Sequence, residues 1–142
     1  MIRGLEHAAL SVSNLERSLA FYTEHLGLTC ARIIECPPEM RLGDVARMPG
    51  CSARIAHLMS GSFMLELFEY LNPEGKAIPS DRRQADHGFI HIGFTSNDVP
   101  ADYSRLKEKG VEFLSEPLEF RPKVWIVYFY GPDGEVCELR QT

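Results

Sequence analysis

Two stretches of this 142-residue chain carry the same pattern and decide its fold. Residues 7–28 read HAALSVSNLERSLAFYTEHLGL, and residues 91–110 read HIGFTSNDVPADYSRLKEKG. Each begins with a histidine in a strand-like run, passes a short polar segment and continues with apolar residues at helical spacing. Each segment then reaches a glycine, where helices commonly stop. The match in type, order and length predicts an internal duplication.

The first copy predicts a strand over 5–12 followed by a helix over 15–26. Asn14 lies directly before the helical spacing, where its side chain can accept a hydrogen bond from the first turn. Gly27 marks the end of the predicted helix, because glycine readily adopts the left-handed conformation that follows a last turn.

The second copy predicts a strand over 89–96 and a helix that ends in the run 101–109. Either Asn97 or Asp98 can cap this helix at its N-terminus. Pro100 suits its first turn, because the missing N–H would have no intrahelical partner there.

Two hairpins complete the duplication. Residues 54–70, RIAHLMSGSFMLELFEY, predict a strand, a turn at Ser60 and Gly61, and a second strand. Residues 124–141, VWIVYFYGPDGEVCELRQ, predict the same arrangement with a turn at 132–134. A further strand is expected before each hairpin, near 28–35 and 111–116.

The predicted fold class is therefore α+β, with two tandem βαβββ modules forming a curved mixed sheet. We expect a single domain, 1–142, made of modules at about 1–70 and 88–142 that are joined by a linker, 71–87. Residues 36–51, rich in proline, glycine and charge, read as an insertion in the first module.

Composition excludes several function classes. The formal net charge is −5 and no basic stripe is present, so nucleic acid is not an expected partner. No apolar run approaches the ~20 residues of a membrane span, and the N-terminus lacks the pattern of a signal peptide. The four cysteines show no CxxC spacing, which favours free thiols in a cytoplasmic protein.

A carboxylate interrupts an apolar run at two equivalent places. FMLELF (63–68) contains Glu66, and EVCEL (135–139) contains Glu138. Burying an unpaired carboxylate is costly, so each one needs a partner. His7 and His91 start the two modules, and together the four side chains form a mixed N/O donor set. Such a set suits a divalent zinc, nickel, cobalt, manganese or iron ion.

Alternation along the strand places Met64 and Phe68 on the same face as Glu66. The remaining apolar residues of the run are expected to pack behind the strand: Phe63, Leu65 and Leu67. Three other histidines have no partner in the repeat and are interpreted as surface or packing residues: His25, His57 and His87.

The quoted segments resemble the vicinal oxygen chelate superfamily. HAALSVSNLERSLAFYTEHLGL, FMLELFEY, GFIHIGF and YGPDGEVCELRQ are similar to its four signature segments. The resemblance implies a cup-shaped sheet around a metal ion, a small-molecule substrate and a homodimer. It leaves open whether one chain or two complete the site.

Within this superfamily, the ligand pattern is most similar to that of bacterial-type glyoxalase I, which implies His7, Glu66, His91 and Glu138 as ligands. The implied reaction is that of a lyase or isomerase, with proton transfer through a metal-stabilised enediolate. Glu138 is the expected base, and Glu66 assists or takes the reverse role. The alternatives are an extradiol-type Fe(II) dioxygenase, an acyl-CoA epimerase and a small-molecule binding or resistance protein.

Six residues are candidates for substrate binding. Arg121 and Lys123 flank the last hairpin and can bind an anionic group. The candidates for an apolar wall are Phe68, Phe94, Trp125 and Tyr128. The segment before this hairpin, EPLEFRPKVW, lacks the glycines usual in glyoxalase I, which points to a different or larger substrate.

Overall fold

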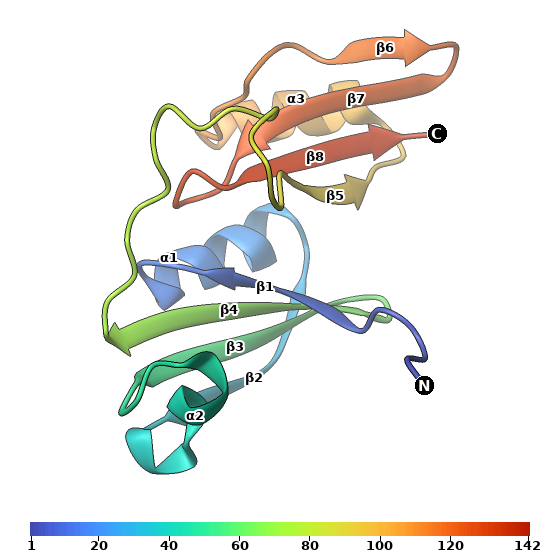
Figure 1. Cartoon of the computed structure of the whole chain (residues 1–142). Coiled ribbons are helices and arrows are strands. Elements are labelled where there is room, and N and C mark those ends of the chain that lie inside the picture. Colours follow the sequence, from blue (N-terminus) through green and yellow to red (C-terminus); the bar gives the residue numbers. More distant parts are fainter. The chain divides into compact units, whose positions relative to one another are not determined.

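A computed structural model describes all residues, 1–142, and confirms the α+β class. The chain divides into two compact units, Met1–Ala77 and Ile78–Thr142, each of which is described by itself. The division falls inside the segment predicted to be a linker. Each unit contains one four-stranded mixed sheet (Figure 1).

The first unit follows the predicted βαβββ order. Its elements are β1 (His7–Ser11), α1 (Leu15–Ala20), the π-helical turn η1 (Phe21–His25), β2 (Thr29–Cys36), β3 (Ser52–Ser60) and β4 (Phe63–Asn72). The strand order is β1-β4-β3-β2. β1 runs parallel to β4, and the other two pairs are antiparallel.

The second unit repeats this topology. Its elements are β5 (Ile92–Thr95), α3 (Val99–Glu108), β6 (Leu118–Arg121), β7 (Val124–Tyr130) and β8 (Val136–Gln141). The strand order β5-β8-β7-β6 matches that of the first unit position by position. Again the first strand is parallel to the last, and the others pair antiparallel. The predicted duplication is confirmed.

The predicted boundaries of the first helix are confirmed by its caps. The Asn14 Oδ1 accepts a hydrogen bond from the backbone N–H of Arg17 at 2.8 Å. Gly27 adopts a φ of +79°, which favours glycine and ends the helical segment. Between them α1 passes into the π-helical turn η1, a widening that the apolar spacing did not reveal.

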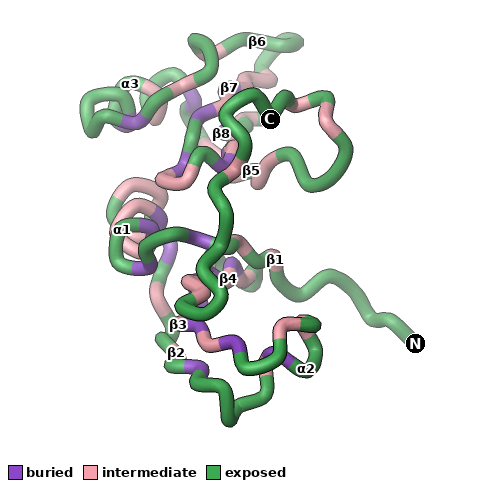
Figure 2. The backbone as a smooth tube through the Cα atoms, turned by 60° about the vertical axis from the view of Figure 1, so that its left-hand side comes forward, coloured by how far each residue is buried: buried purple, intermediate pink, exposed green.

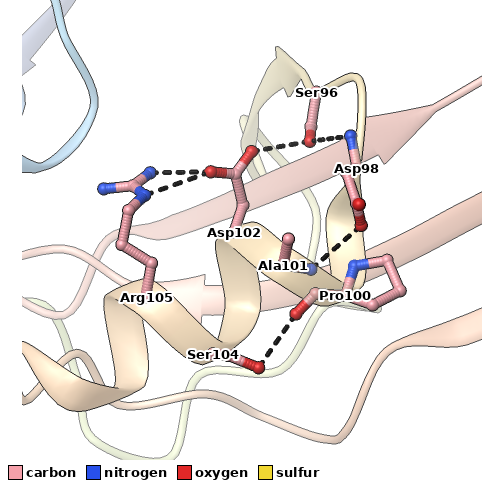
Figure 3. Close-up of polar contacts among 7 residues, drawn as sticks. All are labelled: Ser96, Asp98, Pro100, Ala101, Asp102, Ser104 and Arg105. Atoms are coloured by element: carbon pink, nitrogen blue, oxygen red, sulfur yellow. Dashed lines mark hydrogen bonds and ion pairs between the residues drawn. The ribbon is translucent and has the colours of Figure 1, made fainter.

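The start of α3 is held by a compact polar network (Figure 3). Of the two predicted caps the structure uses Asp98, whose Oδ1 accepts from the N–H of Ala101 at 3.0 Å. The Asp102 carboxylate accepts from the Ser96 hydroxyl at 2.7 Å and from the Arg105 guanidinium at 2.8 Å. Burial opposes ionisation of Asp102, but these hydrogen bonds outweigh it and lower its pKa below the ordinary value.

In the first unit α1 packs on one face of the sheet, against a layer that includes Leu58, Leu65 and Leu67. The expectation that Leu65 and Leu67 lie behind Glu66 is confirmed. The same expectation for Phe63 is wrong, because this side chain is 42% exposed. Phe63 pairs with Ser60 at the end of the hairpin, so alternation directs it to the apolar face at a point beyond the core.

The predicted strand at 111–116 is also wrong. That segment makes only an isolated bridge between Phe113 and Phe129, and the third strand of the unit is β6. Pro117, which directly follows the segment and precedes β6, has no N–H to donate to a ladder, so the segment does not run on into that strand. In the first unit, the prediction near 28–35 is confirmed by β2.

The insertion at 36–51 is ordered and lies over the first sheet. It contains the short helices η2 (Pro38–Met40) and α2 (Leu42–Ala46). Leu42 packs on a cluster formed by Cys36, Ala53 and Ile55, on the face opposite to α1 (Figure 1). This face is the one that carries Glu66, because Ile55 pairs with Phe68 two residues further along β4.

The exposed N-terminus, the cysteines and the helix lengths complete the description of the fold. Residues 1–6 are exposed throughout (Figure 2). All four cysteines are free thiols, three of them buried. None of the helices is both long and apolar enough to span a membrane.

Candidate functional site

Strand register brings the predicted residues of each unit to one face of its sheet. Ala9 of β1 pairs with Glu66, and His7 precedes it by two residues, so His7 and Glu66 share a face. In the second unit Gly93 of β5 pairs with Glu138, and His91 precedes it by two residues. The two histidine–glutamate pairs therefore occupy equivalent positions in the duplication.

In the first unit, His7 lies between two carboxylates. Its Nε2 is 3.4 Å from Glu66 Oε2, and its Nδ1 is 2.9 Å from Glu6 Oε2. The hydrogen bond to Glu6 and the charge of Glu66 raise the pKa of His7 above its ordinary value. When the ring carries one proton, the carboxylate of Glu6 favours that proton on Nδ1, which leaves the lone pair of Nε2 directed at Glu66.

In the second unit, an amide takes the place of Glu6. His91 Nε2 is 3.6 Å from Glu138 Oε2, and His91 Nδ1 is 3.3 Å from Gln84 Oε1. The amide nitrogen of Gln84 donates to the carbonyl of Ile90 at 3.2 Å, so its oxygen faces the histidine. When the ring of His91 carries one proton, Gln84 thus favours that proton on Nδ1, which leaves the lone pair of Nε2 directed at Glu138.

The donor atoms of both histidine–glutamate pairs are of the kinds that bind a metal ion. In both units, an imidazole lone pair and a carboxylate oxygen face one another, and two such acceptors require a proton or a metal cation between them. Imidazole nitrogen and carboxylate oxygen are ordinary ligands of borderline divalent ions. The structure brings no three His, Cys, Asp or Glu side chains together in a preformed metal-holding group. What each unit offers is one fitting pair of donors.

His57, which sequence reasoning left without a role, lies directly opposite Glu66 on β3. Its Nε2 is 3.1 Å from Glu66 Oε1, and both side chains are almost buried. The Nε–H of Arg32, on β2, donates to His57 Nδ1 at 3.1 Å. The signal that could have found His57 is the hairpin register, because a turn after Ser60 sets residue 57 opposite residue 66.

The position equivalent to His57 in the second unit is Tyr128, which lies opposite Glu138. Its ring centroid is 5.2 Å from that of His91. Burial and then the charge of Glu138 raise the pKa of Tyr128 above its ordinary value. Of the predicted wall residues, Tyr128 is thus in contact with the histidine–glutamate pair of its unit.

Of the other predicted wall residues, one lies on the same sheet face as the glutamate of its unit and two lie on the opposite face. Phe68 shares the face of Glu66, stacks on Tyr70 at 5.8 Å between centroids and packs on the cluster below α2. Phe94 and Trp125 pair with Leu139 and Gln141, so alternation puts them on the sheet face opposite to Glu138.

The predicted anion-binding residues lie at the hairpin that joins β6 and β7. Arg121 ends β6 and is exposed. Lys123 is also exposed, has a φ of +67° and donates its backbone N–H to Glu119 Oε1 at 2.9 Å. Neither side chain is brought to His91 or Glu138 by a hydrogen bond or ion pair.

Comparisons with known proteins agree with this topology. A family model described as the Glyoxalase/Bleomycin resistance protein/Dioxygenase superfamily matches residues 4–139. The metallothiol transferase FosB of Staphylococcus haemolyticus is 32% identical over 142 aligned residues, which cover 98% of this chain and 84% of that protein. A probable lactoylglutathione lyase of Synechocystis is 25% identical over 146 aligned residues, which cover 97% of this chain and 95% of that protein.

The fold itself has a close counterpart among solved structures. A glyoxalase family protein from Bacillus cereus aligns with a TM-score of 0.89 and 22% identity, over 99% of this chain and 94% of that one. At this identity the likeness shows the fold. The family match across residues 4–139 confirms the resemblance that the repeated segments indicated. The chain belongs to the glyoxalase/bleomycin resistance protein/dioxygenase superfamily, the vicinal oxygen chelate proteins.

Proposed function

We propose that the protein is a divalent-metal-dependent lyase or isomerase of the glyoxalase I type, with His7, Glu66, His91 and Glu138 as the metal ligands. One observation carries the proposal: in equivalent positions of the duplication, an imidazole Nε2 faces a carboxylate oxygen, at 3.4 Å in the first unit and 3.6 Å in the second. Glu6 and Gln84 support it by accepting from the far nitrogen of each ring. A mixed N/O set of this kind suits zinc, nickel, cobalt, manganese or iron.

The metal ion would supply Lewis-acid polarisation of a carbonyl and a neighbouring hydroxyl oxygen of the substrate, which acidifies the C–H beside the carbonyl. The chain itself supplies the proton transfer. We assign Glu138 as the base that accepts the carbon-bound proton and returns it to the neighbouring carbon. Glu66 serves mainly as a ligand, because His57 already occupies one of its oxygens.

The substrate is a small molecule with two vicinal oxygens. Phe68 and Tyr128, which share faces with the two glutamates, would contact its apolar part. Arg121 and Lys123 would serve a negatively charged part that extends along the β6–β7 hairpin. We also expect a homodimer, which light scattering after size-exclusion chromatography measures directly.

Untagged protein reloaded with nickel, cobalt, zinc or manganese tests the proposal. We expect one bound ion per set of four ligands and formation of lactoylglutathione from methylglyoxal and glutathione, or solvent-deuterium incorporation at the reacting carbon of a related hydroxycarbonyl substrate. The control is the double variant His91→Ala and Glu138→Ala, which removes one donor pair. A protein that binds none of these ions at micromolar concentration would contradict the proposal.

A second candidate is a metal-dependent thiol transferase, which the 32% identity with FosB favours. This reading needs only His7, His91 and Glu138 as ligands. The same metal-loaded protein is offered a thiol with fosfomycin as acceptor, and loss of free thiol is measured. Addition of the thiol to fosfomycin without formation of lactoylglutathione would select the transferase. Oxygen uptake in the presence of a catechol would instead select the dioxygenase alternative.

A further inference from the structure

We propose that Arg32 and His57 are positioning residues that lock the carboxylate of Glu66 in one orientation. Their role toward a metal ion depends on the proposed function, whereas the orientation of Glu66 does not. The chain of contacts runs across three neighbouring strands: Arg32 on β2, His57 on β3 and Glu66 on β4.

The chemistry of the contacts sets the direction of every hydrogen bond. A guanidinium N–H can only donate, so His57 Nδ1, 3.1 Å from Arg32 Nε, must accept with its lone pair. A neutral His57 therefore carries its proton on Nε2, where it donates to Glu66 Oε1 at 3.1 Å. A proton on both nitrogens would turn an N–H against the guanidinium, so Arg32 holds the ring in one tautomer.

The consequence for Glu66 follows from its burial. Its side chain is 13% exposed, so little water is available to replace His57 as a partner. Oε1 is committed to His57, and Oε2 remains directed at His7, 3.4 Å away. Rotation of the carboxylate would cost the His57 hydrogen bond. Glu66 is thus preset to offer one oxygen, which is what a fixed single-oxygen ligand requires.

The second unit lacks this device at the equivalent place. Tyr128 lies opposite Glu138 and packs its ring against His91. The duplication is therefore symmetric in its donor pairs but unequal in the residues that hold the two carboxylates. The residue opposite Glu138 is thus a tyrosine and not a histidine held by an arginine, in keeping with the assignment of Glu138 as base.

A metal-free measurement tests the orientation of Glu66 directly. Nitrogen-15 NMR of labelled protein distinguishes the two neutral tautomers of His57 and the doubly protonated ring. We expect the Nε2–H tautomer in the wild type and loss of this single tautomer in Arg32→Met. An Nδ1–H tautomer or a doubly protonated ring in the wild type would overturn the proposal, whether or not the protein binds metal.

Metal affinity tests the consequence. Zinc affinity, measured by competition with a chelating dye, should fall about 10- to 100-fold in His57→Phe, the range typical when a residue that orients a ligand is lost. His57→Gln, which keeps a donor toward Glu66 and an acceptor toward Arg32, should recover most of that loss. Melting temperatures of all variants identify any that fail to fold, and the NMR result then decides.

The matched control is Arg54→Met. Arg54, like Arg32, carries a guanidinium on the sheet of the first unit. It forms ion pairs with Glu16, Glu35 and Glu69 on the sheet face opposite to Glu66. We expect its zinc affinity to stay within about twofold of wild type, because it contacts no donor. Unchanged affinity in His57→Phe would overturn the positioning role, and wild-type protein that binds no zinc would overturn the proposed function alone.

Discussion

His91 turns its two ring nitrogens to different partners, Nδ1 to the amide oxygen of Gln84 at 3.3 Å and Nε2 to Glu138 at 3.6 Å. In the first unit His7 does the same with a carboxylate, Glu6, in place of the amide. Residues outside the donor set thus select which imidazole nitrogen is free to bind a cation.

Gln84→Leu should lower zinc affinity about tenfold, because His91 loses the acceptor that keeps its proton on Nδ1. Chelator competition measures the change. Gln84→Glu is the control, since it also loses the donor to Ile90 but supplies a carboxylate acceptor like Glu6. We expect it to bind zinc at least as tightly as wild type. Equal weakening in both variants would instead assign the effect to the Ile90 contact.

The two glutamates should respond differently to amide substitution. Glu138→Gln should slow proton exchange at the substrate carbon about 10²- to 10⁴-fold, the usual share of a general base, while metal still binds. Glu66→Gln should mainly weaken metal binding, because it places an amide between His7 and His57. Deuterium exchange and metal content are measured on the same preparations. If both variants keep metal and full turnover, the base lies elsewhere.

Two apolar residues of β4 should differ sharply in their contribution to stability. Leu67 is fully buried, so Leu67→Ala should lower the free energy of unfolding by about 2–5 kcal/mol. Phe63 belongs to the same strand face but is 42% exposed at the end of the hairpin, so Phe63→Ala should cost less than ~1 kcal/mol. Urea denaturation compares them, and a large loss in Phe63→Ala would show that it is covered in solution.

Acid should remove a contribution that Asp102 makes to the stability of the second unit. The pKa of Asp102 is lowered in the folded protein from its ordinary 3.8. Its contribution to stability is therefore complete at a pH above the pKa of the unfolded chain, and it is lost as the pH falls through the lower pKa of the folded protein. Asp102→Asn should lower stability by ~1 kcal/mol at pH 7 and flatten the pH dependence below pH 4.

Thermal melts from pH 2 to pH 7 measure this effect. Asp86→Asn is a suitable control, because Asp86 is also hydrogen-bonded, to Arg83, but lies in an exposed loop before β5. Its loss should change the melting temperature little. A pH profile of Asp102→Asn that parallels wild type would contradict the assignment.

Local chemistry in the sequence was enough to predict much of the fold. Asn14 and Asp98 cap their helices through contacts with residues three positions away, and alternation along β4 places Leu65 and Leu67 in the core. The duplication added long-range information, since equal order in two copies implies equal topology. The local pattern was wrong at 111–116, where Phe113 makes one isolated bridge and packs its ring on Tyr103 and Phe129, and the third strand begins only after Pro117.

Periodicity, capping residues and the internal duplication were enough to predict the two βαβββ units and the equivalent places of His7, Glu66, His91 and Glu138. The surroundings of these four side chains depend on strand pairing and could not be predicted from local patterns. Arg32 and His57 are 25 residues apart and meet because strand pairing aligns them. Because the carboxylate of Glu66 is nearly buried, little water can replace these hydrogen bonds, so they set its orientation.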